Sequence, residues 1–262
     1  MGKLDFTDMK AQYSYILFIA GLLTIFSCTK ETEVTQHTYS GEEVTISLIA
    51  TTPDCSVRTV LGDETGRKSI SWADKDSIAI YYGTSATSFK DVPVGEGGEI
   101  NFRIQTSATK NFYSVCPHTV SAKMNSATEF RITIPQEQNG SFAEACIMAA
   151  WAGTDRLLRF QMASSLVVID IKDNAVTKVV LRANDGTPIA GNALLEFDQE
   201  SGVINKISLP ENGAKEIILN VSGSGRYFVA LLPDVNLKAG IGFNVYKDSE
   251  ASGALSRTAL PL

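Results

Sequence analysis

The sequence predicts an all-β fold with little helix, and three observations lead to this prediction. Apolar and polar residues alternate along many short segments, these segments are rich in Val, Ile, Tyr, Phe and Thr, and Gly, Asn, Asp or Pro separates them. Helix signals are scarce along the chain. Regular short strands with turn residues between them favour a β-sandwich or a β-barrel.

The composition excludes several classes of protein. Of the 262 residues 44% are apolar and 20% are charged, which is too apolar for a disordered tail. The formal net charge of −6 does not suit a protein that tracks phosphates, so we expect no nucleic-acid partner. Four cysteines and two histidines are few for a disulfide scaffold or a histidine-rich metal site, and we predict no cofactor and no metal.

The first 27 residues have the pattern of a secretory signal peptide. Residues 15–27 are almost wholly apolar and follow Lys3 and Lys10, and the run is shorter than the roughly 20 residues needed to span a bilayer. Cys28 follows the small Ser27 and resembles the acylated cysteine of a bacterial lipobox. We therefore predict a signal peptide over 1–27 and lipidation at Cys28, with an uncleaved membrane anchor as the alternative.

Residues 28–41 form a polar stretch without periodicity, which we interpret as a tether. Its start, 29–33, resembles the short charged tag that directs some lipoproteins of Gram-negative anaerobes to the cell surface. Because two or more acyl chains hold a protein firmly at a bilayer, we expect a surface-exposed lipoprotein of the outer membrane.

Strands are predicted from residue 42 onward, and one face of the first strand carries Val44, Ile46, Leu48 and Ala50. The segment 141–151 has a Ser cap followed by a Glu, and it fits either a helix or a loop that leads into a buried strand. Residues 157–173 are too many for one straight strand, so we expect a bend or a crossover there. The other main strands are predicted at 77–82, 99–104, 111–115, 130–134, 176–181, 193–197, 217–221, 227–232 and 241–246.

The length beyond the tether suits two domains, because one sandwich requires roughly 100 residues. We predict two tandem antiparallel β-sandwiches of the transthyretin-like type, over 42–165 and 166–262, with one large sandwich as the alternative. The chain ends at Leu262 in a segment that resembles the middle of a strand. We therefore expect the second sandwich to lack a C-terminal element.

The remaining cysteines and the acidic turn residues have simple structural interpretations. No pair among Cys55, Cys116 and Cys146 has metal-ligand spacing, so we interpret them as small buried apolar residues. Asp74 and Asp76 suit a turn better than a cation site, because no third carboxylate follows at the EF-hand spacing.

No local signature of a catalytic site is present, and we predict no catalytic residue. His118 lies two residues after Cys116, and this spacing alone places both side chains on one face of a strand. A pair of glycosidase carboxylates is brought together by the fold rather than by sequence spacing, so an enzyme stays open as a minor alternative.

Several short motifs follow one another in a set order, namely Cys28, the strand 43–51, Arg58-Thr59, Ser71-Trp72, Asp76-Ser77-Ile78, 112–117, 134–138, 158–160, 188–191 and 227–233. This order resembles the fimbrillin-like family, which comprises lipoprotein precursors of type V pilus subunits and surface relatives in Gram-negative anaerobes. Cys116-Pro117 stands where the family has Tyr-Pro.

The resemblance implies a mechanism of assembly. In that family an arginine-specific protease removes the first strand, and a strand from the next subunit fills the groove left behind. The candidate first strand here carries Val44, Ile46, Leu48 and Ala50, and the candidate cleavage sites are Arg58 and, as second choice, Arg67. The alternative is that Arg58 is an ordinary loop residue and the first strand stays in place.

The partners that this resemblance implies are other pilus subunits through β-strand exchange, the outer membrane through the lipid, and a glycan or protein on a host or bacterial surface. The alternative function is a glycan-binding surface lipoprotein, for which exposed aromatic side chains are the candidates, namely Tyr81, Tyr82, Tyr113 and Tyr246.

Overall fold

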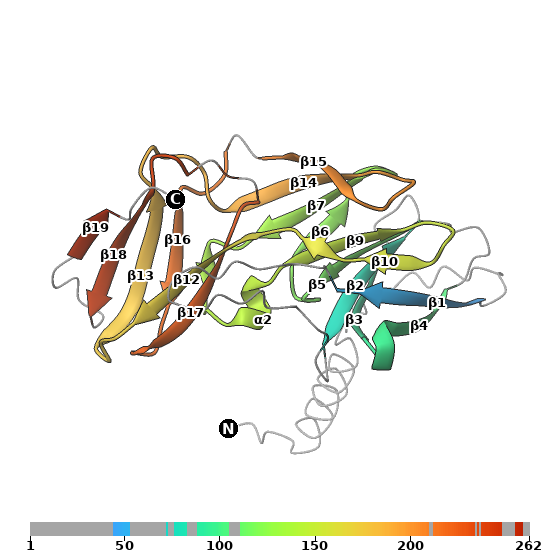
Figure 1. The fold of residues 1–262 in the computed structure, drawn as a ribbon, viewed down its shortest axis with the longest axis horizontal. Helices are drawn as coiled ribbons and strands as arrows, with labels where there is room; N and C mark the ends of the chain where they lie inside the picture. The colour runs from blue at the N-terminus through green and yellow to red at the C-terminus, as the bar shows by residue number, and fades with distance from the viewer. Residues whose placement is uncertain are drawn as a thin grey trace, which may run out of the picture. The chain divides into compact units, whose positions relative to one another are not determined.

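The computed structural model describes residues 44–52, 72, 76–82, 88–104, 111–209, 212–233, 235, 237–247 and 255–258. These residues form an all-β fold of packed, mostly antiparallel sheets, in which the helical segments are the single turn α2 (Phe142–Ala145) and the 3-10 turn η1 (Glu96–Gly98) (Figure 1). The all-β class with little helix is therefore confirmed.

The first strand belongs to one small sheet, which packs on a larger one. The smaller one, which we call the β1 sheet, has the order β10 (Leu157–Arg159), β1 (Val44–Thr51), β4 (Glu99–Ile104). The larger one, which we call the central sheet, has the order β11 (Gln161–Met162), β9 (Met148–Ala152), β5 (Phe112–Cys116), β2 (Ser77–Tyr82), β3 (Ser88–Pro93).

The central sheet is buried on both faces, because every residue of β5 and β9 is buried. Ile78, Ile80 and Phe112 point into one apolar cluster, which the central sheet shares with the β1 sheet. Tyr113 and Val115 point into a second, larger cluster on the opposite face. Strands buried on both sides have nearly continuous apolar sequences rather than strict alternation.

The other strands form three further sheets (Figure 1). A four-stranded sheet has the order β15 (Ile204–Ser208), β14 (Gly191–Phe197), β7 (Glu129–Ile134), β6 (Ala122–Met124). A five-stranded sheet has the order β19 (Leu255–Thr258), β18 (Ile241–Lys247), β13 (Val176–Ala183), β16 (Glu216–Asn220), β8 (Glu137–Gln138). A two-stranded sheet pairs β12 (Ser165–Ile171) with β17 (Gly225–Leu231).

Hydrogen bonds cross the predicted domain boundary at residue 165. β7 pairs with β14, and β8 pairs with β16. The buried Gln138 side chain also accepts from the Ala230 amide (2.9 Å) and donates to the Ala230 carbonyl (2.8 Å). Residues 42–262 form one compact unit. The division into two tandem transthyretin-like sandwiches stays a prediction, and these pairings link the two predicted stretches.

Two segments with unusual sequence patterns are resolved in detail. The bend or crossover expected within 157–173 is confirmed, since this segment supplies β10, β11 and β12 to three different sheets. Both interpretations of 141–151 hold in part. The Ser141 hydroxyl accepts from the Glu144 amide at 3.2 Å and caps the one-turn helix α2, and the buried strand β9 follows.

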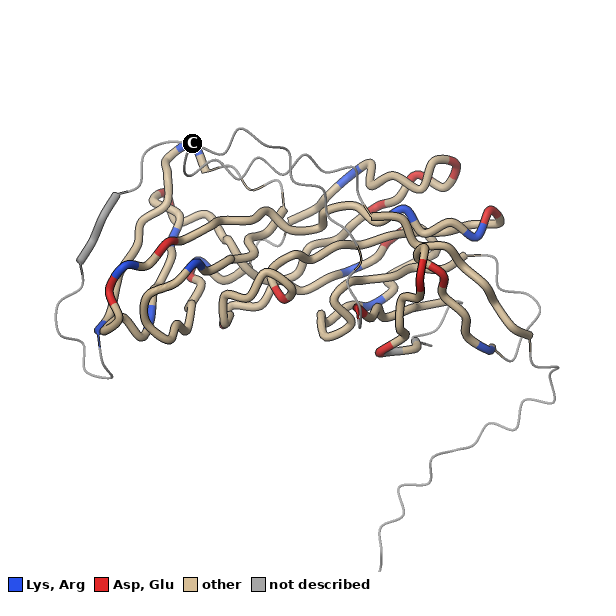
Figure 2. Tube along the Cα trace, turned by 60° about the horizontal axis from the view of Figure 1, so that its bottom comes forward, with Lys and Arg blue, Asp and Glu red and all other residues tan. Residues whose placement is uncertain are grey.

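Acidic and basic residues are interspersed along the described trace (Figure 2). Several of them form ion pairs between neighbouring strands, such as Arg226 with Asp170 (2.9 Å) and Arg182 with Glu216 (2.8 Å). These hydrogen-bonded partners hold the pKa of Asp170 and of Glu216 below their usual ranges. Such exposed pairs set strand register more than they add stability.

Candidate functional site

Strand β1 lies between two other strands and covers an apolar floor. It pairs antiparallel with β4 from Val44 to Ile49 and parallel with β10 from Ile49 to Thr51. Its inward side chains Ile46, Leu48 and Ala50 are 6%, 1% and 3% exposed, whereas Ile49 on the outer face is 52% exposed. The alternation predicted for this strand is confirmed. We call the space that β1 fills between β4 and β10 the β1 slot.

The floor of the β1 slot is aromatic and aliphatic. Leu48 and Ile46 belong to the cluster that contains Ile80, Phe102 and Phe112. The Phe102 and Phe112 rings lie edge to face with centroids 5.7 Å apart. A strand that leaves this slot therefore uncovers a preformed apolar surface.

Trp72, Phe160 and Gly98 contact the C-terminal end of β1. The Trp72 indole nitrogen donates to the Ala50 carbonyl at 3.2 Å, and the Trp72 ring lies edge-on to Phe160 with centroids 5.2 Å apart. The Phe160 amide donates to the Thr51 carbonyl at 3.0 Å. Gly98 approaches so closely that a Cβ there would lie 2.1 Å from the Ala50 oxygen, so only glycine fits.

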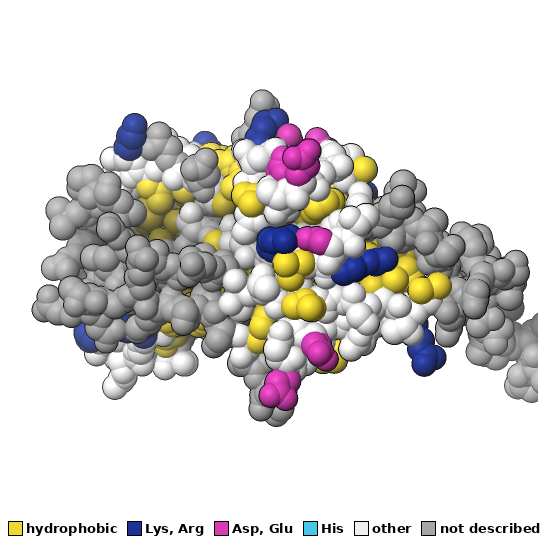
Figure 3. Space-filling model, turned by 45° about the vertical axis from the view of Figure 1, so that its right-hand side comes forward, with side chains coloured by type: hydrophobic (Ala, Val, Ile, Leu, Met, Phe, Trp, Pro, Cys, Tyr) yellow, Lys and Arg dark blue, Asp and Glu magenta, His cyan; other side chains and the backbone are white. Residues whose placement is uncertain are grey.

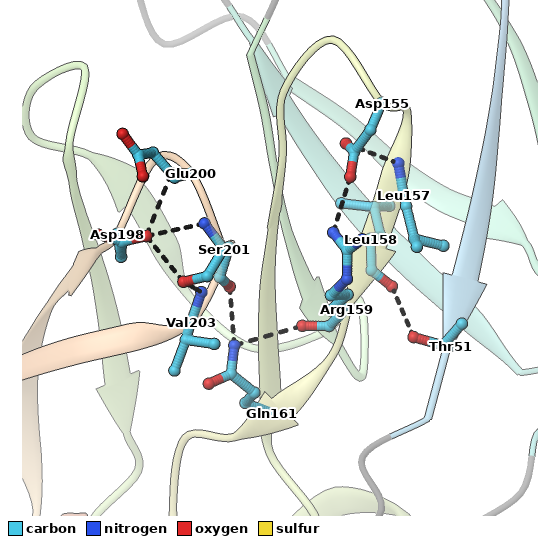
Figure 4. Close-up of polar contacts among 11 residues, drawn as sticks. Thr51, Asp155, Leu157, Leu158, Arg159, Gln161, Asp198, Glu200, Ser201 and Val203 are labelled. Carbon is cyan, nitrogen blue, oxygen red and sulfur yellow. Dashed lines mark hydrogen bonds and ion pairs between the residues drawn. The ribbon is translucent and has the colours of Figure 1, made fainter.

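Strand β10, one wall of the slot, has anchors that do not involve β1 (Figure 4). The Asp155 carboxylate accepts from the Arg159 guanidinium at 2.7 Å and from the Leu157 amide at 3.2 Å. The Arg159 hydrogen bond, which is the larger effect, and the Leu157 amide hold the pKa of Asp155 below its usual range. This network fixes the β9–β10 turn.

The chain that follows β10 is clamped to the turn between β14 and β15 (Figure 4). The Gln161 side chain donates to the Gly202 carbonyl at 2.9 Å and accepts from the Ile204 amide at 3.0 Å. Asp198 caps that turn by accepting from the Ser201 amide at 2.7 Å, and this bond lowers the pKa of Asp198. Contacts other than those with β1 therefore also hold β10 and the residues next to it.

The sequence-predicted site residues are only partly within the described residues. The structure brings Val44, Ile46, Leu48 and Ala50 together as one strand in the β1 slot. The lipidation site Cys28 and the cleavage sites Arg58 and Arg67 lie outside the described residues, as do the signal peptide, the tether, Cys55 and Asp74.

Two of the aromatic candidates for glycan binding were wrong. Tyr81 and Tyr113 are 4% and 0% exposed, so neither ring is open to a sugar. Tyr82 stacks on Phe89 with centroids 5.7 Å apart, and the Lys178 ammonium lies 4.4 Å from the Tyr246 ring centroid. One face of each ring therefore has a partner within the protein.

The described residues bring His118 close to a hydroxyl and a carboxylate, without the geometry of a triad. The Ser77 hydroxyl lies 2.7 Å from His118 Nδ1, and the nearest Asp91 oxygen lies 3.8 Å from the same nitrogen. A catalytic triad uses the two ring nitrogens separately. Burial raises the pKa of the Cys116 thiol to about 12, with smaller contributions from Asp76 and Cys146, so this thiol is a poor nucleophile at neutral pH.

Sequence reasoning missed Arg156, which adjoins the β1 slot. Its carbonyl accepts from the Ile49 amide at 3.1 Å, and its guanidinium carbon lies 5.0 Å from the Phe112 ring centroid. Its Nη1 is buried and has no hydrogen-bond partner among the described residues. In the sequence Arg156 is one more residue of a polar turn, and the only available signal is its place directly before a predicted strand.

Figure 3 shows one side of the surface, where small patches of apolar side chains are separated by polar and charged ones. Within the described part of the chain, no three His, Cys, Asp or Glu side chains are placed to hold a metal ion. None of the helices described has the length and apolarity needed to cross a bilayer. No protein-family model matches this chain, and no curated protein sequence matches it.

Proposed function

We propose that the protein is a structural or accessory subunit of a cell-surface pilus. In this proposal it is a lipoprotein of the outer membrane that assembles by strand addition after losing β1. The observation that carries the proposal is the seating of β1, which pairs with β4 and β10 and whose three inward side chains are almost completely buried.

The energetics support exchange rather than simple loss of β1. Burial of Ile46 and Leu48 contributes about 1.5–3 kcal/mol each before the cost of ordering the strand. Removal of β1 also leaves the edges of β4 and β10 without their hydrogen-bond partner. Exposed edges and apolar floors bind an added strand, so another subunit could supply the replacement.

The order of the elements along the chain allows a single cleavage to separate β1 from the rest of the protein. Arg58 and Arg67 both follow β1 and precede Trp72, so cleavage at either site separates β1 from the strands that form its slot. The same cut releases Cys28, and with it the predicted lipid, from the body of the protein. Processing would thus couple release from the anchor to opening of the slot.

The test is treatment of the full chain with an arginine-specific protease, followed by N-terminal sequencing and by gels of boiled and unboiled samples. We expect a mature start at Thr59 and a ladder of polymers that disappears on boiling. Arg58→Ala should shift the start to residue 68 or abolish the ladder. A lipidated form that starts at Cys28, with no shorter product and no ladder, would overturn the proposal.

Glycan binding is the second candidate function, and a cavity favours it. The cavity has a volume of about 360 Å³ and is lined by hydroxyl, amide and carboxylate groups beside an aromatic ring, including Ser121, Asn139, Glu144 and Phe228. This mixture suits a neutral sugar. Retention on polysaccharide that is lost in Asn139→Ala and kept in the exposed control Glu200→Ala would support this function, and equal retention of both variants would contradict it.

A further inference from the structure

Arg156 carries a buried hydrogen-bond donor that nothing in the described structure satisfies. Its guanidinium lies over the Phe112 ring, whose side chain belongs to the floor of the β1 slot, and its Nη1 is buried without a partner. A buried polar group without a partner is rare and costly in native proteins. Arginine also presents a fork of donors that suits a carboxylate, which makes the missing partner recognisable by its chemistry.

The backbone at Arg156 is also unusual. Its φ of 60° lies in the left-handed region, which residues other than Gly, Asn and Asp seldom adopt. The turn is held by the Arg156 amide, which donates to the Gly153 carbonyl at 3.3 Å, and by the bond from the Ile49 amide to the Arg156 carbonyl. Backbone outliers of this kind cluster at functional sites.

The register of β1 identifies which position faces Arg156. Ile49 pairs with Leu157 and its amide donates to the Arg156 carbonyl, so Leu48, which precedes Ile49, is the inward residue of β1 nearest to Arg156 in register. Leu48 is 1% exposed and points into the same apolar cluster as Phe112. A leucine side chain has no acceptor, so β1 fills the slot by shape and leaves the buried donor unpaired.

We infer that the strand that replaces β1 presents a carboxylate, from a Glu at the position of Leu48, to the Arg156 guanidinium. This inference rests on the proposed function, because it concerns the partner strand of the β1 slot. The incoming strand keeps the apolar contacts of β1 and adds a charge-assisted hydrogen bond that β1 lacks. The slot therefore binds the partner strand more tightly than it binds β1 or any other strand without an acceptor at that position.

The first test is a double-mutant cycle in the full chain. Leu48→Glu should increase the equilibrium constant for unfolding at least about tenfold more when combined with Arg156→Met than when Arg156 is present. The matched control is Ala50→Glu, which places the carboxylate one inward position further along β1 and should show the same effect in both backgrounds. Independent effects of the changes at 48 and 156 would overturn the inference.

The second test measures exchange itself and does not depend on the folding of Leu48→Glu. The full chain is treated with an arginine-specific protease and mixed with a fluorescent peptide of residues 43–52, either unaltered or carrying Leu48→Glu. We expect the Leu48→Glu peptide to bind at least about tenfold more tightly, and the preference to disappear in Arg156→Met. Equal binding of the two peptides overturns the inference and leaves the proposed function standing, whereas binding of neither peptide overturns both.

Discussion

The Trp72 indole nitrogen donates a hydrogen bond of 3.2 Å to the carbonyl oxygen of Ala50, 22 residues earlier in the chain. This bond joins the C-terminal end of β1 to a residue on the other side of the candidate cleavage sites Arg58 and Arg67. A cut at either site leaves Trp72 with the body of the protein and Ala50 with the departing strand. Trp72 is therefore a latch on β1 that cleavage does not remove.

Replacement of the latch should loosen β1 without removing its aromatic packing. Trp72→Phe keeps a ring beside Phe160 and deletes the donor to Ala50, so we expect a loss of about 0.5–1.5 kcal/mol in the free energy of unfolding. Denaturant titration measures the loss, and release of β1 after cleavage should become faster. The matched control is Trp151→Phe, because the Trp151 indole nitrogen has no partner among the described residues. If amide hydrogen exchange along β1 increases equally in Trp72→Phe and in Trp151→Phe, this role of Trp72 is contradicted.

Gly98 and Gly97 give a matched pair for testing how closely β1 is seated. Both have positive φ values, 82° and 69°, so an alanine at either position carries a similar backbone cost of about 1–2 kcal/mol. A Cβ at Gly98 would lie 2.1 Å from the Ala50 oxygen, whereas one at Gly97 meets nothing within 4 Å. We expect Gly98→Ala to destabilise the protein clearly more than Gly97→Ala and to increase amide exchange along β1. Equal destabilisation by the two alanines would show that β1 is not held at this point.

Much of β1 was predictable because its signal is local. The alternation of the buried Ile46, Leu48 and Ala50 with exposed neighbours follows from the two-residue period of a strand that is buried on one face only. Its parallel pairing with β10 was not predictable, since Leu157 lies more than 100 residues away and parallel partners leave no turn signal between them.

The parts that sequence reasoning missed depend on tertiary packing. In the sequence, Tyr81 and Tyr113 fit either an exposed aromatic position or a core position. The larger apolar cluster that packs on one face of the central sheet is what buries them. Arg156 is polar and lies in a turn, which normally indicates exposure, but its guanidinium carbon lies 5.0 Å from the Phe112 ring centroid. The lipobox and the cleavage sites stay predictions.

Substitution of Gln138 tests whether the two predicted sandwiches unfold together. Its side chain makes hydrogen bonds to both backbone groups of Ala230 and so links β8 to β17. Gln138→Leu leaves the Ala230 amide and carbonyl buried and unpaired, and we expect it to lower the free energy of unfolding by about 2–6 kcal/mol.

Calorimetry of Gln138→Leu, with the exposed neighbour Glu137→Ala as control, measures both the loss and its cooperativity. A single transition that moves to lower temperature would show that 42–165 and 166–262 unfold as one unit. Two separate transitions in the unaltered protein would instead support independent tandem sandwiches.

Alkaline pH should destabilise the protein through groups that are buried in their neutral form. Burial raises the pKa of Cys116 from 9.0 to about 12, and it also raises the pKa values of Tyr81 and Tyr113 above 10.0. Between pH 9 and 12 the unfolded chain therefore loses the Cys116 proton while the folded chain keeps it, so the unfolded state is favoured as pH rises. Each such group lowers the free energy of unfolding by about 1.4 kcal/mol per pH unit within its window.

Denaturant titrations at pH 8, 9 and 10 measure this slope. Cys116→Ala has a cost of its own at every pH because it removes buried volume, so the comparison concerns the change with pH and not the absolute stability. We expect the variant to lose less stability than the unaltered protein between pH 9 and 10. The second variant is Cys146→Ala, at a position in the same apolar cluster as Cys116. The Cys116 thiol is still present in this variant, so the change of stability with pH should largely remain. Identical slopes in the unaltered protein and in Cys116→Ala would mean that this thiol ionises alike in the folded and unfolded chains. In that case the thiol is not buried under the β1 sheet in solution.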